Sequence, residues 1–199
     1  MSVKVFGEDA NLVTSLGSIT QGIGKEFIPI EGTIPTLGSD VQLVYTPVLL
    51  GSSFVNQSPV ALDTPLQVNF GAASSNAFID LDAAGNITFL QVGVYEVSIR
   101  VALGRTTNPG AAILLARATL NGSQIGNSFH ANLPDQDTNI PLSVQTNITA
   151  SVNDVFAVQI MRSSAGVNAG GLFTQAGTAG WNNSPSAQAT VTRVTGVVV

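Results

Sequence analysis

Hydrophobic and polar positions alternate along the chain in short runs. The clearest run is NITFLQVGVYEVSIRVALG, residues 86–104, in which five apolar residues share one side of a period of two: Tyr95, Val97, Ile99, Val101 and Leu103. A period of two is typical of a β-strand with one buried face. The intervening positions are mixed and include an acid, Glu96, and a base, Arg100. The stretch therefore predicts a strand whose second face meets water, a ligand or another copy of the chain.

Similar runs, rich in Val, Ile, Thr, Leu and Phe, recur along the chain. Strands are predicted at 65–70, 77–81, 87–89, 94–103, 113–120, 123–129, 142–148, 155–162, 171–174 and 187–194. Turn-forming residues separate them, since the chain holds 20 Gly and 9 Pro. The pair Asn121-Gly122 predicts a tight hairpin, and it favours a strand over a helix for the apolar segment just before it. The pattern as a whole predicts an all-β sandwich or barrel.

Residues 1–50 differ from the rest of the sequence. Their Pro and Gly residues are too closely spaced for long regular elements, as in FIPIEGTIPTLG. An apolar segment of this kind is a liability when it is free in water. We therefore predict an extended N-terminal arm over 1–50 that docks on a neighbouring molecule, followed by a β domain over 51–199. The alternative is that the segment adds further strands to the same sandwich.

The composition is poor in charge. Hydrophobic residues make up 44% and charged residues 10%, against about 25% charged residues in typical globular domains. Such a chain either buries much of its surface against partners or occupies a virion or extracellular setting. A net charge of −5 without a basic run argues against nucleic-acid binding. The absence of Cys excludes disulfides and thiolate metal sites, and no run predicts a signal peptide or a membrane span.

Four segments, taken in order, resemble a known family. The first segment is IDLDAAGNITFL, which leads into Gly93-Val94-Tyr95, and the second is LLARATLNGS, which carries the Asn-Gly pair. The third is ITASVNDVFAVQI, which contains the turn Asn153-Asp154, and the fourth is the last strand of the chain. This order over residues 55–199 resembles the tumour-necrosis-factor-like jelly roll, and most closely its complement-type globular head. Asn153 stands where the family usually has Gly.

The resemblance implies a jelly roll of ten strands that assembles as a compact trimer. It implies that Tyr95 lies in the core, while Glu96, Ser98 and Arg100 face the other subunits. Because buried charges need partners, we predict that Glu96 and Arg100 pair, within or across subunits. Ala157 and Gln159 are predicted to join the same interface. The alternative is an exposed sheet face on which these groups are solvated.

Candidate chemistry outside this face is sparse. His130 has no recognisable catalytic partners and is expected at a surface or interface. Asp80 and Asp82 do not fit an EF-hand loop, and they are interpreted as turn residues. Asp135, Asp137 and Trp181 are predicted to lie in loops that contact a ligand or a partner protein. Calcium binding by the two acids and stacking of a sugar on Trp181 are left open. We predict a protein without enzymatic activity, cofactor or metal.

These observations lead to a functional hypothesis. The chain is predicted to be a bacteriophage structural protein, a trimeric cement protein that decorates the capsid. Its partners would be two further copies of itself and the major capsid protein, without nucleic acid or membrane. It would be assembled in the host cytoplasm and located on the virion surface. The alternative is the tip of a tail fibre or surface fibre that binds a carbohydrate or receptor.

Overall fold

The computed structural model describes residues 41–105, 110–136 and 138–198. All regular secondary structure in these ranges is β-strand, so the predicted all-β class is confirmed. The same ranges contain no helix long and apolar enough to cross a membrane.

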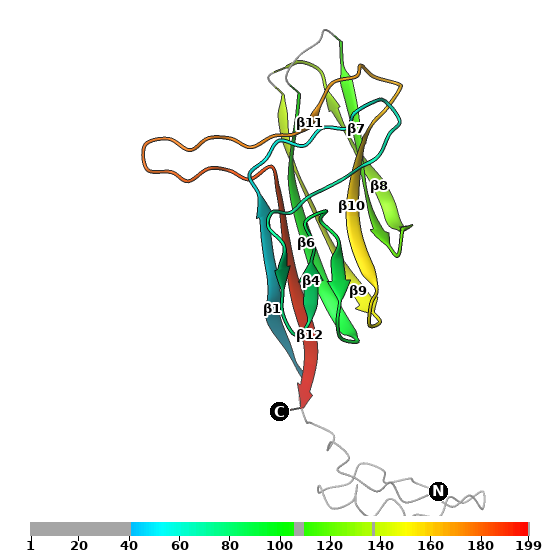
Figure 1. The fold of residues 1–199 in the computed structure, drawn as a ribbon, viewed down its shortest axis with the longest axis vertical. Coiled ribbons are helices and arrows are strands. Elements are labelled where there is room, and N and C mark those ends of the chain that lie inside the picture. Colours follow the sequence, from blue (N-terminus) through cyan, green and yellow to red (C-terminus); the bar gives the residue numbers. More distant parts are fainter. Residues whose placement is uncertain (1–40, 106–109, 137, 199) are drawn as a thin grey trace, which may run out of the picture. The chain divides into compact units, whose positions relative to one another are not determined.

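Two sheets form a sandwich, and Figure 1 labels most of their strands. The first sheet contains β1 (Val41–Ser53), β12 (Ala187–Val198), β6 (Gly93–Gly104), β11 (Gly171–Leu172) and β9 (Asn139–Ala150). The second contains β3 (Ser74–Ser75), β4 (Ile79–Leu81), β5 (Ile87–Phe89), β10 (Val155–Arg162), β7 (Ala112–Leu120), β8 (Ser123–Leu133) and β2 (Leu66–Gln67). β5 and β10 have the predicted bounds.

The long strands pair in a nested order. β7 pairs with β8, β6 with β9, β5 with β10, and β1 with β12. A chain acquires this order when one long antiparallel hairpin rolls into two facing sheets, which is the jelly-roll arrangement. The predicted jelly-roll sandwich is therefore confirmed.

The core lies between the sheets and follows the alternation of β6. The five predicted core residues of that strand are each at most 5% exposed: Tyr95, Val97, Ile99, Val101 and Leu103. The Tyr95 ring lies 4.7 Å from the ring of Phe89, centroid to centroid. Its hydroxyl donates a hydrogen bond to the backbone oxygen of Gln91, at 2.9 Å. The Gly93-Val94-Tyr95 motif thus anchors β6 in the core through both the ring and the hydroxyl of its tyrosine.

The start of the sandwich corrects the predicted boundary of the arm. β1 begins at Val41, so residues 41–50, which we assigned to the arm, belong to the first sheet. β1 is an edge strand, where Pro47 is tolerated because one side of the backbone makes no ladder bonds. Only its last residues reach the core, and Leu43, Tyr45 and Leu50 are exposed, so the strand lacks a simple alternation. Residues 1–40 lie outside the described residues, and the arm remains a prediction there.

Two of the turn motifs are hydrogen-bonded to each other. The side-chain amide of Asn121, in the β7–β8 hairpin, donates to Oδ1 of Asp154 at 2.8 Å. In return, the backbone N–H of Val155 donates to Oδ1 of Asn121 at 2.9 Å. Asn153 has a φ of 69°, a left-handed conformation that Asn tolerates better than most residues. Asn153 can therefore form this turn without a glycine.

Acid should weaken this part of the fold. The hydrogen bond from Asn121, with a second from the backbone N–H of Ser151, lowers the pKa of Asp154. The folded state therefore binds this proton less readily than the unfolded state, and the carboxylate stabilises the fold above the unfolded pKa, about 4. That contribution is lost as the pH falls through the lower folded pKa. In urea titrations between pH 7 and pH 2.5, Asp154→Asn should flatten the acid side of the stability profile.

A matched substitution controls this experiment. Asp80 lies on β4 and its carboxylate accepts no hydrogen bond from the described residues, so Asp80→Asn removes a charge without removing such a contact. Equal flattening by both substitutions would mean that net charge, rather than the Asn121–Asp154 contact, controls acid stability.

Candidate functional site

The outward face of β6 continues across the two strands beside it. Cross-strand pairing sets three rows of three residues, in which the middle residue comes from β6 and its neighbours from β12 and β9. The rows are Thr192–Glu96–Asn147, Thr190–Ser98–Gln145 and Gln188–Arg100–Ser143. We call these nine residues the polar sheet face. Seven of the nine are uncharged, and in this single chain all nine are half-buried or exposed.

The structure brings Glu96, Ser98 and Arg100 together on this face, as predicted, but it does not pair the two charges. Glu96 and Arg100 are four residues apart on one strand, which separates their Cα atoms by about 13 Å. Neither side chain makes a hydrogen bond or ion pair with another described residue. Pairing within the chain is therefore not seen, and only pairing across subunits remains a prediction.

Ala157 and Gln159 do not lie on the polar sheet face, so the expectation that their strand is a neighbour of β6 is wrong, while their place in a subunit interface stays a prediction. Both are on β10, in the other sheet, where Ala157 is 5% exposed. Oε1 of Gln159 accepts two hydrogen bonds from the Arg117 guanidinium, at 2.9 and 2.7 Å. β10 lies between β5 and β7, so it cannot be the neighbour of β6 that we expected.

A groove opens at the end of the polar sheet face that carries Arg100. Its free volume is about 230 Å³. The side walls come from β6, β9, β12 and the segment that follows β11. Their polar and aromatic side chains are Arg100, Asn139, Phe173, Gln175, Ser184 and Gln188. Pro141 and Pro185 add apolar surface. Among the described residues that line the groove, Arg100 is the only charged one.

Residues 173–186, which we call the finger, project sideways from the sandwich between β11 and β12 (Figure 1). Backbone hydrogen bonds of 3.1 and 2.8 Å join Gln175 and Ser184 across its base. Nearer the tip, Trp181 N–H donates to the Thr178 oxygen at 2.9 Å, and Ala179 has a φ of 49°. The predicted partner residue Trp181 is 82% exposed. The finger is thus a hydrogen-bonded loop that presents an aromatic side chain to solvent.

The predicted loop acids lie elsewhere. Asp135 is exposed in the β8–β9 loop, and its Oδ1 accepts a hydrogen bond from the Thr138 hydroxyl at 3.0 Å. Asp137 lies outside the described residues. The structure therefore places Asp135 and Trp181 in two different loops, and it does not bring them into one site.

The remaining acids and the histidine support no chemical site among the described residues. Asp82 accepts hydrogen bonds from Ala84 N–H, Asn86 N–H and the Asn86 side chain, at 2.7–2.9 Å, as expected for a turn residue. Partial burial alone would raise the pKa of Asp82, but these bonds outweigh it and lower that pKa. His130 is exposed on β8, and the described residues contain no cluster of three His, Cys, Asp or Glu residues that could hold a metal.

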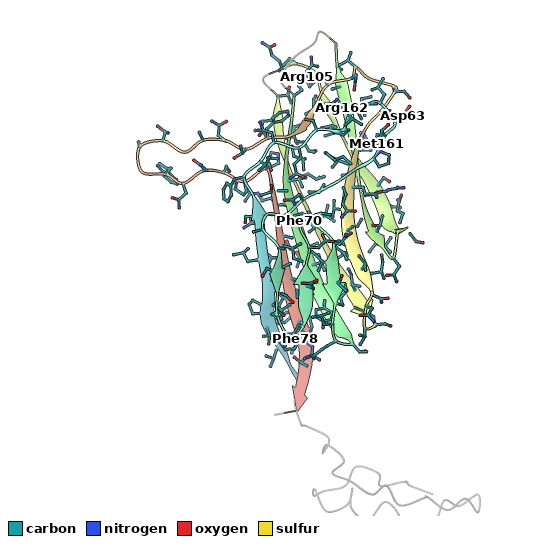
Figure 2. All side chains as sticks on the ribbon, viewed as in Figure 1. Asp63, Phe70, Phe78, Arg105, Met161 and Arg162 are labelled. Atoms are coloured by element: carbon teal, nitrogen blue, oxygen red, sulfur yellow. The ribbon has the colours of Figure 1, made fainter. Side chains whose placement is uncertain are left out.

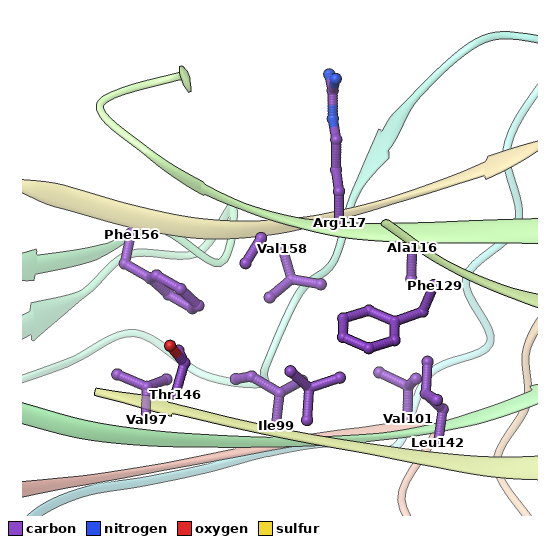
Figure 3. A pocket seen from close by; sticks show the side chains of 12 residues that line it. Val97, Ile99, Val101, Ala116, Arg117, Phe129, Leu142, Thr146, Phe156 and Val158 are labelled. Atoms are coloured by element: carbon purple, nitrogen blue, oxygen red, sulfur yellow. The ribbon is translucent and has the colours of Figure 1, made fainter. Parts of the chain in front are cut away.

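A second cavity is entirely different in character. It lies between the sheets beside β8 and β9, with a free volume of about 30 Å³. Figure 3 shows apolar side chains facing each other across it, among them Phe129, Val158 and Ile99, while Arg117 points away from it. Space for about one water molecule, without polar partners, is not a ligand site. Its importance is that Phe129 remains 38% exposed at this side of the sandwich.

Sequence reasoning missed the groove. Its lining comes from four segments that are far apart in the chain, and Asn, Gln and Ser are so common here that no local motif marks those involved. Figure 2 conveys how widely polar side chains are spread over the molecule. The pairing of β6 with β12 sets Gln188 opposite Arg100, and the pairing of β6 with β9 brings Asn139, opposite Gly104, to the same end of the sheet.

Comparisons with known proteins found only distant likenesses among solved structures. No protein-family model and no curated protein matches the chain. Among solved structures, the Eiger TNF from S. frugiperda is similar over 78% of this chain and 93% of that one, at 9% identity and a TM-score of 0.42. The globular domain of the zebrafish complement 1qA protein is similar over 79% and 96%, at 15% identity and a TM-score of 0.37. Likenesses this distant imply nothing about activity or partners.

Proposed function

We propose that this chain is a non-enzymatic bacteriophage virion protein that forms a homotrimer and decorates the capsid as a cement protein. The observation that carries the proposal is the polar sheet face. An outward sheet face normally keeps its solubility with Lys and Glu, whereas this one has seven uncharged residues among nine. Covering it with another subunit removes few charges from water, so the desolvation cost is low.

A second surface supports self-association. Phe129 of β8 and Leu142 and Val144 of β9 are incompletely buried where the sandwich opens between these strands. A neighbouring subunit that covers this strip would remove apolar surface from water, which favours association. The chain thus has one surface for hydrogen bonding, the polar sheet face, and one for apolar contact, formed by Phe129, Leu142 and Val144.

The cement role follows from multivalency. A trimer carries three copies of the predicted N-terminal arm, and each arm would contact a different coat subunit. Linking three weak contacts raises the effective concentration of each one and slows dissociation. Because the trimer would bind the intact shell and not separated coat subunits, mass action would stabilise the shell.

A new charge on the polar sheet face should break the trimer. Ser98→Glu places a carboxylate in the middle row of each subunit, where covering it is costly. We expect light scattering at micromolar concentration to give the mass of a trimer for the wild type and of a monomer for the variant. Asn132→Glu adds the same charge at an exposed position of β8 and should remain trimeric. A monomeric wild type would refute the trimer.

The arm is tested with coat shells that lack this protein. Deletion of residues 1–40 leaves every described strand in place, whereas deletion of 1–50 would also remove most of β1. The shorter deletion should preserve the trimer and abolish cosedimentation with the shells. Undiminished cosedimentation would count against the arm, and failure of the full chain to bind shells would count against the cement role.

The finger favours one alternative function, that of a receptor-binding fibre tip. Trp side chains are enriched among the residues that dominate binding energies, and Trp181 is 82% exposed on a hydrogen-bonded loop. Binding of the purified protein to host cells that is lost in Trp181→Ala, together with no binding to coat shells, would support this function over the cement role.

A further inference from the structure

The groove at Arg100 contains the elements of a small-molecule site. Arg100 is exposed, its guanidinium has no hydrogen-bond or ion-pair partner among the described residues, and no acid lines the groove. A guanidinium presents paired N–H groups that match the two oxygens of a carboxylate. The charge in the groove is therefore positive, on a chain whose net charge is −5.

The other polar groups that line the groove suit hydroxyl groups. Asn139, Gln175 and Gln188 have side-chain amides that both donate and accept hydrogen bonds, and the described residues leave all three amides without a partner. Gln188 is directly opposite Arg100 in the pairing of β12 with β6. A ligand that reaches Arg100 thus lies beside an amide that can bind a neighbouring hydroxyl.

The walls and the size limit the ligand further. The Phe173 ring and two prolines provide apolar surface, against which the C–H face of a sugar ring can pack. A free volume of about 230 Å³ suits one ring rather than a long chain.

We propose that the groove binds a sugar acid, a single ring with a carboxylate and several hydroxyl groups. Arg100 binds the carboxylate, the amides of Gln188, Gln175 and Asn139 bind the hydroxyls, and Phe173 packs against the ring. This inference does not depend on the capsid role. It assigns Arg100 and Gln188, in the last row of the polar sheet face, to a ligand, so that a neighbouring subunit would cover only the other two rows. Arg100 then does not pair with the Glu96 of a neighbouring subunit, and the two assignments can be distinguished.

The first test is titration with D-glucuronate, D-glucose and acetate, followed by ligand-observed NMR and calorimetry. Glucuronate should bind more tightly than both other probes, because only it has a carboxylate and ring hydroxyls together. Equal affinity for acetate and glucuronate would reduce the site to a bare anion contact and overturn the proposal. Absence of binding by all three probes would also overturn it.

Variants locate the binding. Arg100→Gln should weaken glucuronate binding by about tenfold or more, since it removes a charge-assisted hydrogen bond. Gln188→Ala should weaken glucuronate binding and leave acetate binding unchanged. Arg117→Gln is the matched control, because Arg117 is on the outward face of the other sheet, bonded to Gln159. Unchanged glucuronate binding in Arg100→Gln would refute the site.

Light scattering on the same variants separates this proposal from the trimer. If Arg100→Gln stays trimeric and loses glucuronate, Arg100 serves the ligand. If Arg100→Gln becomes monomeric, Arg100 holds subunits together and the proposal is wrong. If the wild type is monomeric and still binds glucuronate through Arg100, the trimer fails while the ligand site stands.

Discussion

Replacing Tyr95 by alanine should lower the free energy of unfolding by about 3–5 kcal/mol, the range seen when a buried aromatic side chain is truncated. Tyr95 is fully buried, packs 4.7 Å from Phe89 between ring centroids, and is hydrogen-bonded to Gln91. Truncation leaves a ring-sized cavity at the start of β6, which joins β9 and β12 in the first sheet. Urea denaturation at fixed protein concentration measures the effect, since unfolding of an oligomer depends on concentration.

Tyr95→Phe separates the ring from the hydroxyl. It keeps the contact with Phe89 and removes only the hydrogen bond to Gln91, so the expected loss is about 1 kcal/mol. Burial raises the pKa of Tyr95, and the nearby positive charge of Arg193 opposes that rise. The folded state therefore keeps this proton when the unfolded state has lost it, and the wild type should lose stability as the pH rises above about 10. Tyr95→Phe should lack that alkaline loss.

A loss below about 1 kcal/mol in Tyr95→Ala would contradict the placement of this ring in the core. It would mean that the Gly-Val-Tyr motif does not anchor the first sheet. A loss equally large in Tyr95→Phe would instead identify the hydroxyl as the essential group.

Most of the fold could be predicted from the sequence because its strands carry local signals. β10 has its predicted bounds, and the Asn121-Gly122 pair lies where β7 turns into β8. β1 had no such signal. The first part of this edge strand is exposed, so nothing requires apolar and polar residues to alternate there, and its sequence looks like that of an arm.

The candidate site could be predicted only where its residues share a strand. Glu96, Ser98 and Arg100 follow from the period of β6 alone. Assigning Ala157 and Gln159 to the same face required knowing which strands are neighbours in a sheet, and the topology places β9 and β10, which are consecutive in the chain, in different sheets. The groove depends on the same long-range pairing, which a local pattern does not contain.

The turn between β4 and β5 should be nearly as sensitive to substitution as Tyr95, but for a reason that lies in the backbone. Gly85 has a φ of 92°, a conformation that residues with a Cβ rarely adopt. A Cβ built there would lie 2.0 Å from the backbone oxygen of Val68. Val68 is fully buried, and its N–H donates to the Val158 oxygen of β10 at 2.8 Å. The clash therefore cannot be relieved without moving a segment that is bonded to the second sheet.

Gly85→Ala should thus cost about 2–4 kcal/mol, as the sum of conformational strain and overpacking. Gly122→Ala is the matched control. Gly122 also has a positive φ, 77°, but a Cβ there would meet no atom within 4 Å. It should cost about 1 kcal/mol, the strain alone. Urea denaturation of both variants separates the two contributions, because only Gly85→Ala carries the clash. Equal losses would show that the segment around Val68 moves away at little cost, and that the Asp82–Asn86 turn is not tightly packed against it.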